Sequence, residues 1–404
     1  MNAKVESLRE FYDLMFESKD LRKLIVQRIF DCRNVDRSMV EPLELVLHLL
    51  EGIPQFEGTS VLPFREKSFV SLNLSYEIAE LKKDIYYLTH SEKEFYGYLE
   101  TLHPGLQEQL ELCEDMLSGV NFRNFIADRD GTLNNYCGRY KSSIQSVYNS
   151  LFLTRFGKSC TENAVILTSA PLQGNGLLDV SIDPEGIFIY AGSKGREYID
   201  RSGKKGSLPL LRDEQKKLGV LNLRLSELVR EPKYEIFSLI GSGLQFKFGQ
   251  TTIAKQDIYG SIPEEKSKDL VHEVYRILKE IDPEGRYFRT EDTGKDIEIL
   301  LTVQKANDTN ALKDFDKGDG IRFLDNKLDL HLDEGLNLIC GDTLSDIPMI
   351  CTAIERTEDT WALFVSSDEK VKSAVKKTCL KHCFLSEPDM LVCLLNNIWE
   401  RTTS

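Results

Sequence analysis

Two aspartates one residue apart follow a short apolar run and are succeeded at once by a glycine. The apolar residues 125–127 predict a buried strand, and Gly131 predicts the turn after it. Alternation along a strand places the side chains of Asp128 and Asp130 on the same side as the chain leaves the sheet. Two carboxylates at such a place are costly to bury without a cation, and oxygen ligands of this kind suit Mg2+.

A second acidic cluster follows another apolar run, residues 337–340, far along the chain. Asp342 follows Gly341, which comes directly after this predicted strand, and is a candidate Mg2+ ligand. Asp346, four residues later, is placed to orient a metal-bound water or the metal ligands. A capped helix start with an acidic first turn would account for one aspartate. It does not account for two acidic clusters that both follow apolar strands, so we expect a metal-assisted phosphoryl-transfer site.

The two aspartates of the first cluster have different predicted roles. Asp128 is the candidate nucleophile, because a carboxylate can attack phosphorus and form an aspartyl-phosphate. Asp130 is the candidate acid that protonates the leaving alcohol and the base that then activates water. Its neighbours are therefore expected to raise its pKa. The turn at Gly131 and Thr132 offers backbone N–H groups to phosphate oxygens, which makes Thr132 a candidate substrate-binding residue.

Hydroxyl and ammonium groups that could hold a phosphoryl group stand between the two clusters. The apolar residues 164–167 predict a strand that ends at Thr168 and Ser169, and either hydroxyl could donate to a phosphoryl oxygen. Lys317 lies beside glycines at a predicted helix start, where its charge could stabilise the transferring group. Each of these signals is weak alone, and the order of the whole set makes it specific.

The region that precedes these motifs, residues 1–118, has apolar residues three to four apart and Lys and Glu on the other faces. This periodicity predicts a bundle of four to six helices, with breaks near residues 52–54 and 103–105. No cluster in it resembles a catalytic site.

The motifs themselves lie in a region of α/β texture. Short apolar strands alternate with helical or turn segments, which is typical of a parallel sheet covered by helices. The predicted strands are 122–127, 164–167, 186–191 and 337–340. This region, 119–212 with 308–404, is predicted to be interrupted by a small α+β domain at 213–307. In that insertion a helix at 264–281 is flanked by strand-like segments at 235–240, 244–248 and 296–303.

The composition limits the class of protein. The formal net charge of −14 disfavours non-specific nucleic-acid binding, which needs basic patches. No apolar stretch approaches the roughly 20 residues that span a bilayer, and the first residues have no apolar signal core. The nine cysteines are odd in number and scattered, which fits reduced thiols in a cytoplasmic protein. A zinc site at residues 379–383 is disfavoured because no second ligand pair follows at matching spacing.

The ordered set of motifs resembles the haloacid dehalogenase superfamily of phosphotransferases. The resemblance implies a Rossmann-like core, an aspartyl-phosphate intermediate, a Mg2+ cofactor, and an inserted cap that covers the site and selects the substrate. The matching residues are Asp128 and Asp130, Thr168, Lys317, then Asp342 and Asp346. The four aspartates are the metal ligands that this resemblance implies.

Within that superfamily the chain is similar to the trehalose-6-phosphate phosphatases, particularly the nematode type with a helical N-terminal domain. The supporting runs are 128–132, 136–137, 167–172, 192–197, 241–245 and, best of all, 339–349. The resemblance implies hydrolysis of trehalose 6-phosphate, a small-molecule sugar phosphate, with Arg196, Gln245 and Lys247 as candidate sugar contacts. Departures from the family pattern are Arg129 between the two aspartates, Ala170 in the second motif, and Gln245 in place of a glutamate.

Three other functions remain open from the sequence. The chain could hydrolyse another sugar phosphate, such as sucrose phosphate or a phosphorylated glycerate glycoside. It could instead be a phosphosugar mutase of the phosphomannomutase kind, which shares the core. It could also be an inactive scaffold that acts through its helices, although the intact acidic set argues against this. The N-terminal helices could self-associate or dock another protein.

Overall fold

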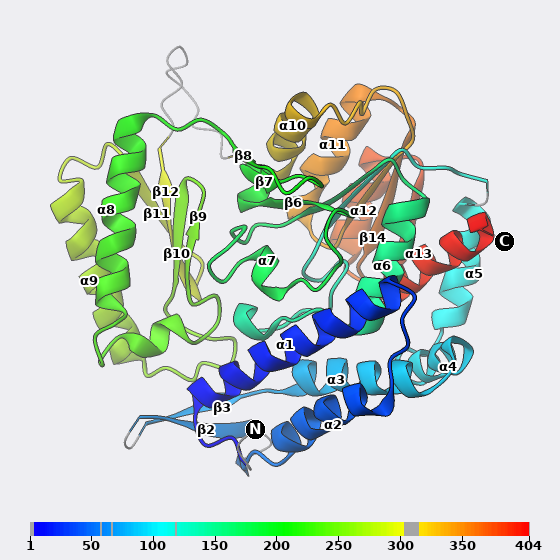
Figure 1. The fold of residues 1–404 in the computed structure, drawn as a ribbon. Coiled ribbons are helices and arrows are strands. Elements are labelled where there is room, and N and C mark those ends of the chain that lie inside the picture. The colour runs from blue at the N-terminus through cyan, green and yellow to red at the C-terminus, as the bar shows by residue number, and fades with distance from the viewer. Residues whose placement is uncertain (1–3, 57–58, 66–67, 118, 303–314, 404) are drawn as a thin grey trace.

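The computed structural model describes residues 4–56, 59–65, 68–117, 119–302 and 315–403. Figure 1 shows a large central sheet with helices on its faces, a smaller sheet with two helices beside it, and the N-terminal helices running beneath both. The α/β core, the inserted α+β cap and the N-terminal helices that the sequence predicts are therefore all present.

The central sheet holds eight strands in the order β15-β14-β13-β4-β5-β6-β7-β8. The strands from β15 to β6 are parallel, and β7 and β8 extend the sheet antiparallel. The bounds are β4 Asn124–Asp128, β5 Asn163–Leu167, β6 Ile189–Gly192, β7 Glu197–Ile199, β8 Lys205–Ser207, β13 Asn337–Gly341, β14 Thr360–Val365 and β15 His382–Leu385.

Both faces of this sheet are covered, so its central strands are apolar on both sides. On one face Phe125 and Ala127 pack with α6 (Val147–Ser159) and α13 (Pro388–Thr403). On the other face Ile126 packs with α10 (Lys317–Leu328), α11 (Ile347–Arg356) and α12 (Glu369–Thr378). The short helix α7 (Leu177–Val180) lies between β5 and β6. Successive side chains of β4 thus pack on opposite faces of the sheet, and this packing fixes the strand that ends at the first acidic pair.

The cap is a four-stranded antiparallel sheet, ordered β11-β12-β10-β9, with two helices on one face (Figure 1). Its other face carries polar side chains, because Gln245, Thr252 and Glu298 stand opposite one another across three strands. The bounds are α8 Arg212–Leu228, β9 Leu244–Lys247, β10 Gln250–Ala254, α9 Glu264–Ile281, β11 Phe288–Asp292 and β12 Asp296–Leu301.

The N-terminal part contains five described helices, within the range that the sequence predicts, and a small antiparallel sheet that it does not. The predicted breaks fall at Gly52, the C-cap of α2, and at His103, the C-cap of α4. The helices are α1 Leu8–Phe30, α2 Arg37–Glu51, α3 Ser75–Thr89, α4 Glu92–Leu102 and α5 Leu106–Leu117. The strands are β1 Gln55–Phe56, β2 Thr59–Arg65 and β3 Ser68–Leu72.

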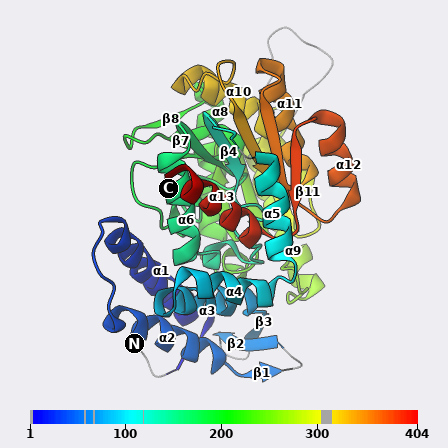
Figure 2. The same cartoon turned by 90° about the vertical axis from the view of Figure 1, so that its right-hand side faces the viewer.

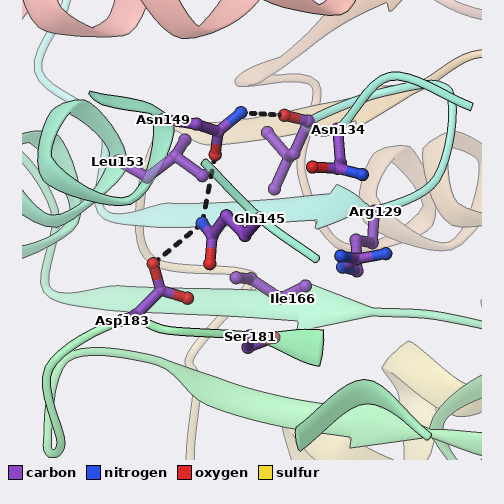
Figure 3. Close-up of a pocket in the computed structure, with 9 residues that line it drawn as sticks. Arg129, Asn134, Gln145, Asn149, Leu153, Ile166, Ser181 and Asp183 are labelled. Atoms are coloured by element: carbon purple, nitrogen blue, oxygen red, sulfur yellow. Dashed lines mark hydrogen bonds between the residues drawn. The ribbon is translucent and has the colours of Figure 1, made fainter. Parts of the chain in front are cut away.

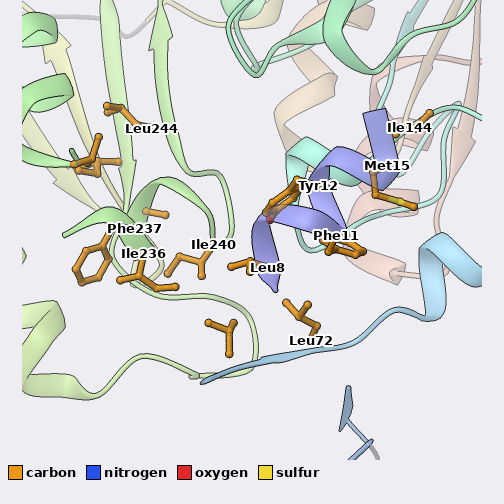
Figure 4. Packing of buried hydrophobic residues seen from close by; sticks show 14 of the residues in the cluster. Leu8, Phe11, Tyr12, Met15, Leu72, Ile144, Ile236, Phe237, Ile240 and Leu244 are labelled. Atoms are coloured by element: carbon orange, nitrogen blue, oxygen red, sulfur yellow. The ribbon is translucent and has the colours of Figure 1, made fainter. Parts of the chain in front are cut away.

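These helices are packed into the rest of the molecule. Figure 2 shows α5 beside α13, and the two share one apolar cluster with the central sheet. Leu8 of α1 lies in the same apolar cluster as Ile236 and Ile240 of the cap (Figure 4). The hydroxyl of Tyr12 donates to the carbonyl oxygen of Leu239. Helix α1 therefore contacts the cap as well as the core.

Several predicted elements differ from those observed. Residues 235–240 form no strand: Glu235–Ser238 is a 3-10 helix, because Ile236, Phe237 and Ile240 have the spacing of one helical turn. The predicted helix at 264–281 matches α9, whereas α8 was not predicted. Residue 303, the predicted end of β12, lies outside the described residues, as do 118 and 308. The division into 1–118, 119–212 with 308–404, and 213–307 remains a proposal.

Candidate active site

The two acidic clusters meet at one edge of the central sheet. Strands β13, β4 and β5 are adjacent and parallel, so their carboxyl ends lie together. Asp128 is the last residue of β4, and Asp342 follows the last residue of β13. Carboxylate oxygens of Asp128, Asp342 and Asp346 lie within 4.8 Å of one another. The arrangement offers a cation three oxygen ligands from distant parts of the chain.

Lys317 reaches into this cluster from the start of α10. Its Nζ lies 2.7 Å from Oδ1 of Asp128 and 2.5 Å from Oδ1 of Asp346, and all three side chains are buried. The helix start is fixed by Asp316, whose side chain accepts from the backbone N–H of Asp319. Gly320 allows the close approach of this helix, because a Cβ there would lie 2.0 Å from the carbonyl oxygen of Lys194. The glycines that follow Lys317 thus help to bring its charge to the site.

Asp346 holds the turn that carries Asp342. Its Oδ2 accepts from the backbone N–H groups of Asp342 at 3.1 Å and Thr343 at 3.0 Å, while its Oδ1 contacts Lys317. Burial opposes ionisation of Asp346, but the Lys317 ammonium and the two N–H groups outweigh it and lower its pKa. The residue that the sequence predicts to orient ligands therefore binds both Lys317 and the turn.

The other two carboxyls of the cluster are shifted in the opposite direction. Burial, with the charge of Asp346 and against that of Lys317, raises the pKa of Asp128 to about 7. Burial together with the charges of Asp128 and Asp346 raises the pKa of Asp342 to about 8. Once all three carboxyls are ionised, three negative charges face one ammonium and negative charge is in excess. A divalent cation would neutralise it, and the donor set fits Mg2+.

The side chain of Asp130 is not part of this cluster. Its Oδ1 is contacted by the guanidinium of Arg129 and lies 3.3 Å from the Ser143 hydroxyl, which donates to it. Arg129 is buried and also donates to Ser143 Oγ at 3.0 Å. The sequence predicts that the neighbours of Asp130 favour its protonated form. The structure instead places the positively charged guanidinium of Arg129 against Asp130. Arg129, a departure from the family pattern, is therefore built into the site.

The predicted hydroxyl groups border the cluster. Thr132 is buried, and its hydroxyl donates to Oδ1 of Asp342 at 3.3 Å. Its side chain therefore links the turn after β4 to a carboxylate of the cluster. Thr168 follows β5 and is buried, with its Oγ1 accepting from the backbone N–H of Ala170 at 3.2 Å. Ser169 is half-buried beside it. Either hydroxyl remains a candidate for the phosphoryl group.

The three predicted sugar contacts lie where the cap meets the core. Nε2 of Gln245 donates to the carbonyl oxygen of Asn175 at 3.0 Å. Arg196 donates to the carbonyl oxygen of Phe248 at 3.2 Å, and its guanidinium lies over the Phe315 ring. The Lys247 ammonium is 3.7 Å from Glu298, and burial lowers its pKa. Gln245 and Arg196 therefore join the cap to the core in this structure.

A cavity of about 150 Å3 lies between the loop after β4 and the cap. It is bordered by Asp130, so a substrate there would be next to the candidate acid. The sequence did not single out Tyr136, Lys295 or Asp296 as site residues, yet all three line it. The available signal was the alternation along β12, where Asp296 and Glu298 are polar between buried isoleucines.

Comparison with known proteins places this geometry in a family. A family model described as trehalose-6-phosphate phosphatase, C-terminal, matches residues 125–391. A second, described as the trehalose-6-phosphate phosphatase N-terminal helical bundle domain, matches residues 7–106. The chain belongs to the trehalose-6-phosphate phosphatase family.

Relatives of this trehalose-6-phosphate phosphatase family member are found among nematodes. A trehalose-phosphatase of Caenorhabditis briggsae is 26% identical over 96% of both chains, and one of Brugia malayi is 27% identical over 98% of this chain and 87% of its own. The alpha,alpha-trehalose-phosphate synthase [UDP-forming] 2 of Caenorhabditis elegans is 31% identical over 96% of this chain. The chain spans only about a third of that synthase.

Gly131 gives this member of the trehalose-6-phosphate phosphatase family a testable constraint on metal binding. Its φ is +87°, and a Cβ there would lie 2.3 Å from Oδ2 of Asp342. Gly131→Ala must therefore displace Asp342, and we expect the Kd for Mg2+, measured by calorimetry, to rise by about tenfold or more. Gly203→Ala is the matched control, because Gly203 has φ +83° but open space around it. Equal affinities in the two variants would contradict the constraint.

The raised pKa values predict how pH changes the stability of the metal-free protein. The folded state holds protons on Asp128 and Asp342 up to about pH 7 and pH 8, whereas unfolded carboxyls lose them near 3.8. The folded state thus binds more protons between these limits, and its stability falls as pH rises through them. We expect Mg2+ to raise Tm more at pH 8.5 than at pH 6, because protons compete for the same oxygens.

Thermal unfolding with EDTA and with Mg2+ at the two pH values measures this effect. Asp342→Asn is the control, because it removes one of the two raised carboxyls and should reduce the difference between the two pH values. An equal gain in Tm at pH 6 and pH 8.5 would show that these carboxylates do not bind the ion.

Proposed function

We propose that this protein is a Mg2+-dependent phosphatase that hydrolyses trehalose 6-phosphate to trehalose and phosphate. The observation that carries the proposal is the convergence of Asp128, Asp342, Asp346 and Lys317 at one sheet edge in a chain of the trehalose-6-phosphate phosphatase family. A cap with a polar sheet face stands beside this edge, which suits a substrate rich in hydroxyl groups.

In the first half of the proposed reaction, a carboxylate oxygen of Asp128 forms a bond to phosphorus and the bond from phosphorus to the sugar oxygen breaks. Asp130 gives its proton to that sugar oxygen. The Lys317 ammonium lies 2.7 Å from Asp128, so it favours the ionised nucleophile. Trehalose leaves with the proton, and Asp128 carries the phosphoryl group.

In the second half, water attacks the phosphorus and the bond to Asp128 breaks, which releases inorganic phosphate. Asp130, now ionised, takes the proton of that water. We propose the Thr168 or Ser169 hydroxyl, at the end of β5, as a donor to the phosphoryl oxygens. The turn at Gly131 and Thr132 also remains a proposed contact, although in this structure its N–H groups donate to the carbonyl oxygens of Asn134 and Arg129.

Mg2+ would neutralise negative charge on the phosphoryl group when bound. We propose Asp128 and Asp342 as its side-chain ligands, with Asp346 either as a third ligand or as the group that fixes the other two. Asp130 also remains a proposed ligand, although its side chain is held by Arg129 and Ser143.

We propose that the sugar is bound between the polar face of the cap and the loop after β4. Lys247 is a proposed contact because it is buried on that face beside Glu298. Gln245 and Arg196 are also proposed sugar contacts. In this structure their side chains form hydrogen bonds that join the cap to the core. The cavity beside Asp130 is lined by polar and aromatic side chains, which suits a disaccharide.

The deciding experiment is phosphate release from trehalose 6-phosphate, with and without Mg2+. Sucrose 6-phosphate, a phosphorylated glucosylglycerate and glucose 6-phosphate complete the panel. We expect trehalose 6-phosphate to be the best substrate and EDTA to remove the activity. Faster release from another sugar phosphate would reassign the substrate, interconversion of sugar phosphates without release would indicate a mutase, and no reaction at all would indicate a scaffold.

We also propose a cytoplasmic location, supported by nine cysteines that are all free. Among the described helices, none combines the length and apolar character that crossing a bilayer requires. The proposed ligand is a small sugar phosphate and not a nucleic acid. Self-association or docking through the N-terminal helices remains a proposal.

A further inference from the structure

One face of α3 in the N-terminal part is polar and buried. Tyr76, Glu77, Glu80, Lys83 and Asp84 lie at helical spacing, and each is at most 9% exposed. Burying such groups is costly unless they are paired and hydrogen-bonded. The partners of this face therefore show what the helix holds in place.

Most of the partners lie in residues 134–147 of the core, the segment that continues from the first acidic motif; the others are Asp389, which pairs with Lys83, and Arg22 of α1, which pairs with Asp84. Glu77 accepts from the side chains of Arg139 and Ser142. Glu80 accepts from Asn135 at 3.1 Å, and Asp84 accepts from the backbone N–H of Val147 at 2.6 Å. Lys83 pairs with Asp389, which also accepts from Asn135. Helix α3 thus binds the whole segment from one side.

Tyr76 is the member of this face that is bonded to Asn134, in the loop that carries Asp130. Its hydroxyl accepts from Nδ2 of Asn134 at 2.8 Å and donates to the carbonyl oxygen of Ile144 at 2.8 Å. These two bonds tie the beginning of the segment to its far side. Nδ2 of Asn134 also lies 3.3 Å from Oγ of Ser143.

Ser143 connects this arrangement to the candidate acid. Its hydroxyl donates to Asp130 and accepts from Arg129, which itself contacts Asp130. The backbone makes the link rigid: the N–H of Gly131 donates to the carbonyl oxygen of Asn134 at 2.8 Å, and the N–H of Asn134 donates to that of Arg129 at 2.9 Å. A displacement of Asn134 must therefore move Asp130.

The other side of Arg129 is also enclosed by polar groups. Figure 3 shows a small cavity there, about 10 Å3, lined in part by Arg129, Asn134 and Gln145. Nε2 of Gln145 donates to both Asn149 and Asp183. Oδ1 of Asn134 is buried and has no hydrogen-bond partner among the described residues. The volume is that of about one water molecule, which could bind this oxygen.

We propose that α3 holds the loop that carries Asp130 in its catalytic position, and that Tyr76 is a positioning residue for Asp130. Tyr76 touches neither substrate nor metal; it acts through Asn134 and Ser143. This inference rests on the proposed function for the role of Asp130. It assigns the N-terminal helices a task in the reaction that is separate from any docking of partners.

Tyr76→Phe removes both hydrogen bonds and keeps the ring, so it tests the proposal without opening a cavity. We expect kcat for trehalose 6-phosphate to fall about tenfold, as for the loss of a well-placed hydrogen bond, with KM changed by less than about twofold. The burst of p-nitrophenol from p-nitrophenyl phosphate should change little, because this leaving group needs no proton. A merely structural loss would slow both reactions alike.

Tyr87→Phe is the matched control, since Tyr87 lies on the same helix and its hydroxyl faces Glu92 and Arg155 instead. It should keep the kcat of the unaltered protein. Ser143→Ala, which breaks the link at Asp130 itself, should reproduce the selective loss seen in Tyr76→Phe. An unchanged kcat in Tyr76→Phe, or an equal loss with both substrates, would overturn the inference.

Amide hydrogen exchange provides a readout that does not depend on activity. Residues 129–147 should exchange about tenfold faster in Tyr76→Phe than in Tyr87→Phe, because the segment loses its tie to α3. Equal exchange in the two variants would overturn the positioning role even if the protein had no phosphatase activity. Absence of phosphate release by the unaltered protein, with the exchange difference present, would instead contradict the proposed function.

Discussion

Asp128→Asn is expected to lower phosphate release by about 10⁴-fold or more while the protein stays folded. The amide cannot attack phosphorus, and removing a catalytic nucleophile typically costs this much. The fold should survive because Asn has nearly the same shape and the change removes one of three clustered carboxylates. Initial rates of phosphate release and thermal unfolding, measured on the same preparation, test both halves of this expectation.

The control is Asp359→Asn, a surface aspartate paired with Lys381 far from the sheet edge. It should keep both the activity and Tm of the unaltered protein. Retained turnover in Asp128→Asn would refute the assigned nucleophile. A collapse of Tm in that variant would show that the carboxylate is needed for the fold, contrary to the excess of negative charge in the cluster.

Lys317→Met should be the most destabilising single change at the site. It leaves Asp128 and Asp346 buried without their cation, and breaking a buried ion pair costs about 3–5 kcal/mol. Phosphate release should also be lost, because Lys317 favours the ionised Asp128. Urea unfolding in EDTA measures the change in the free energy of unfolding.

Addition of Mg2+ should restore part of that stability, because the ion replaces the missing positive charge. Lys381→Met is the matched control: its pair with Asp359 is exposed, and such pairs contribute less than about 1 kcal/mol. If Lys317→Met were no more destabilised than Lys381→Met, the buried contacts of Lys317 would not be stabilising the site.

The placement of the acidic clusters could be predicted because each one follows an apolar strand. Parallel strands end at a common edge, so Asp128 and Asp342 had to meet if β4 and β13 were neighbours. For Asp346 the sequence predicts an orienting role but not the groups that it binds. Its bonds to backbone N–H groups depend on the path of the turn, which residue types and spacing do not determine. The pairing of Arg129 with Asp130 was missed for the same reason.

Helix α3 shows why the N-terminal part was harder to interpret. Periodicity assigns apolar residues to the inside and charged residues to water. In α3 the buried positions include Glu77, Glu80 and Lys83, so that rule gives the wrong face. Their partners, such as Arg139 and Asp389, are far away in sequence. The sheet of β1–β3 was missed because it lies between the long helices α2 and α3, inside the region whose periodicity predicts a helical bundle.

Helix α1 contacts both the cap and the core, between which we propose that the disaccharide binds. Its Leu8 packs against Ile236 and Ile240 of the cap, and Tyr12 is bonded to Leu239, while Phe11 lies beneath Arg139 of the core. Any outward swing of the cap must carry the first turns of α1 along or part Tyr12 from Leu239. If product release required such a swing, its rate would depend on a helix that gives no side chain to the chemistry.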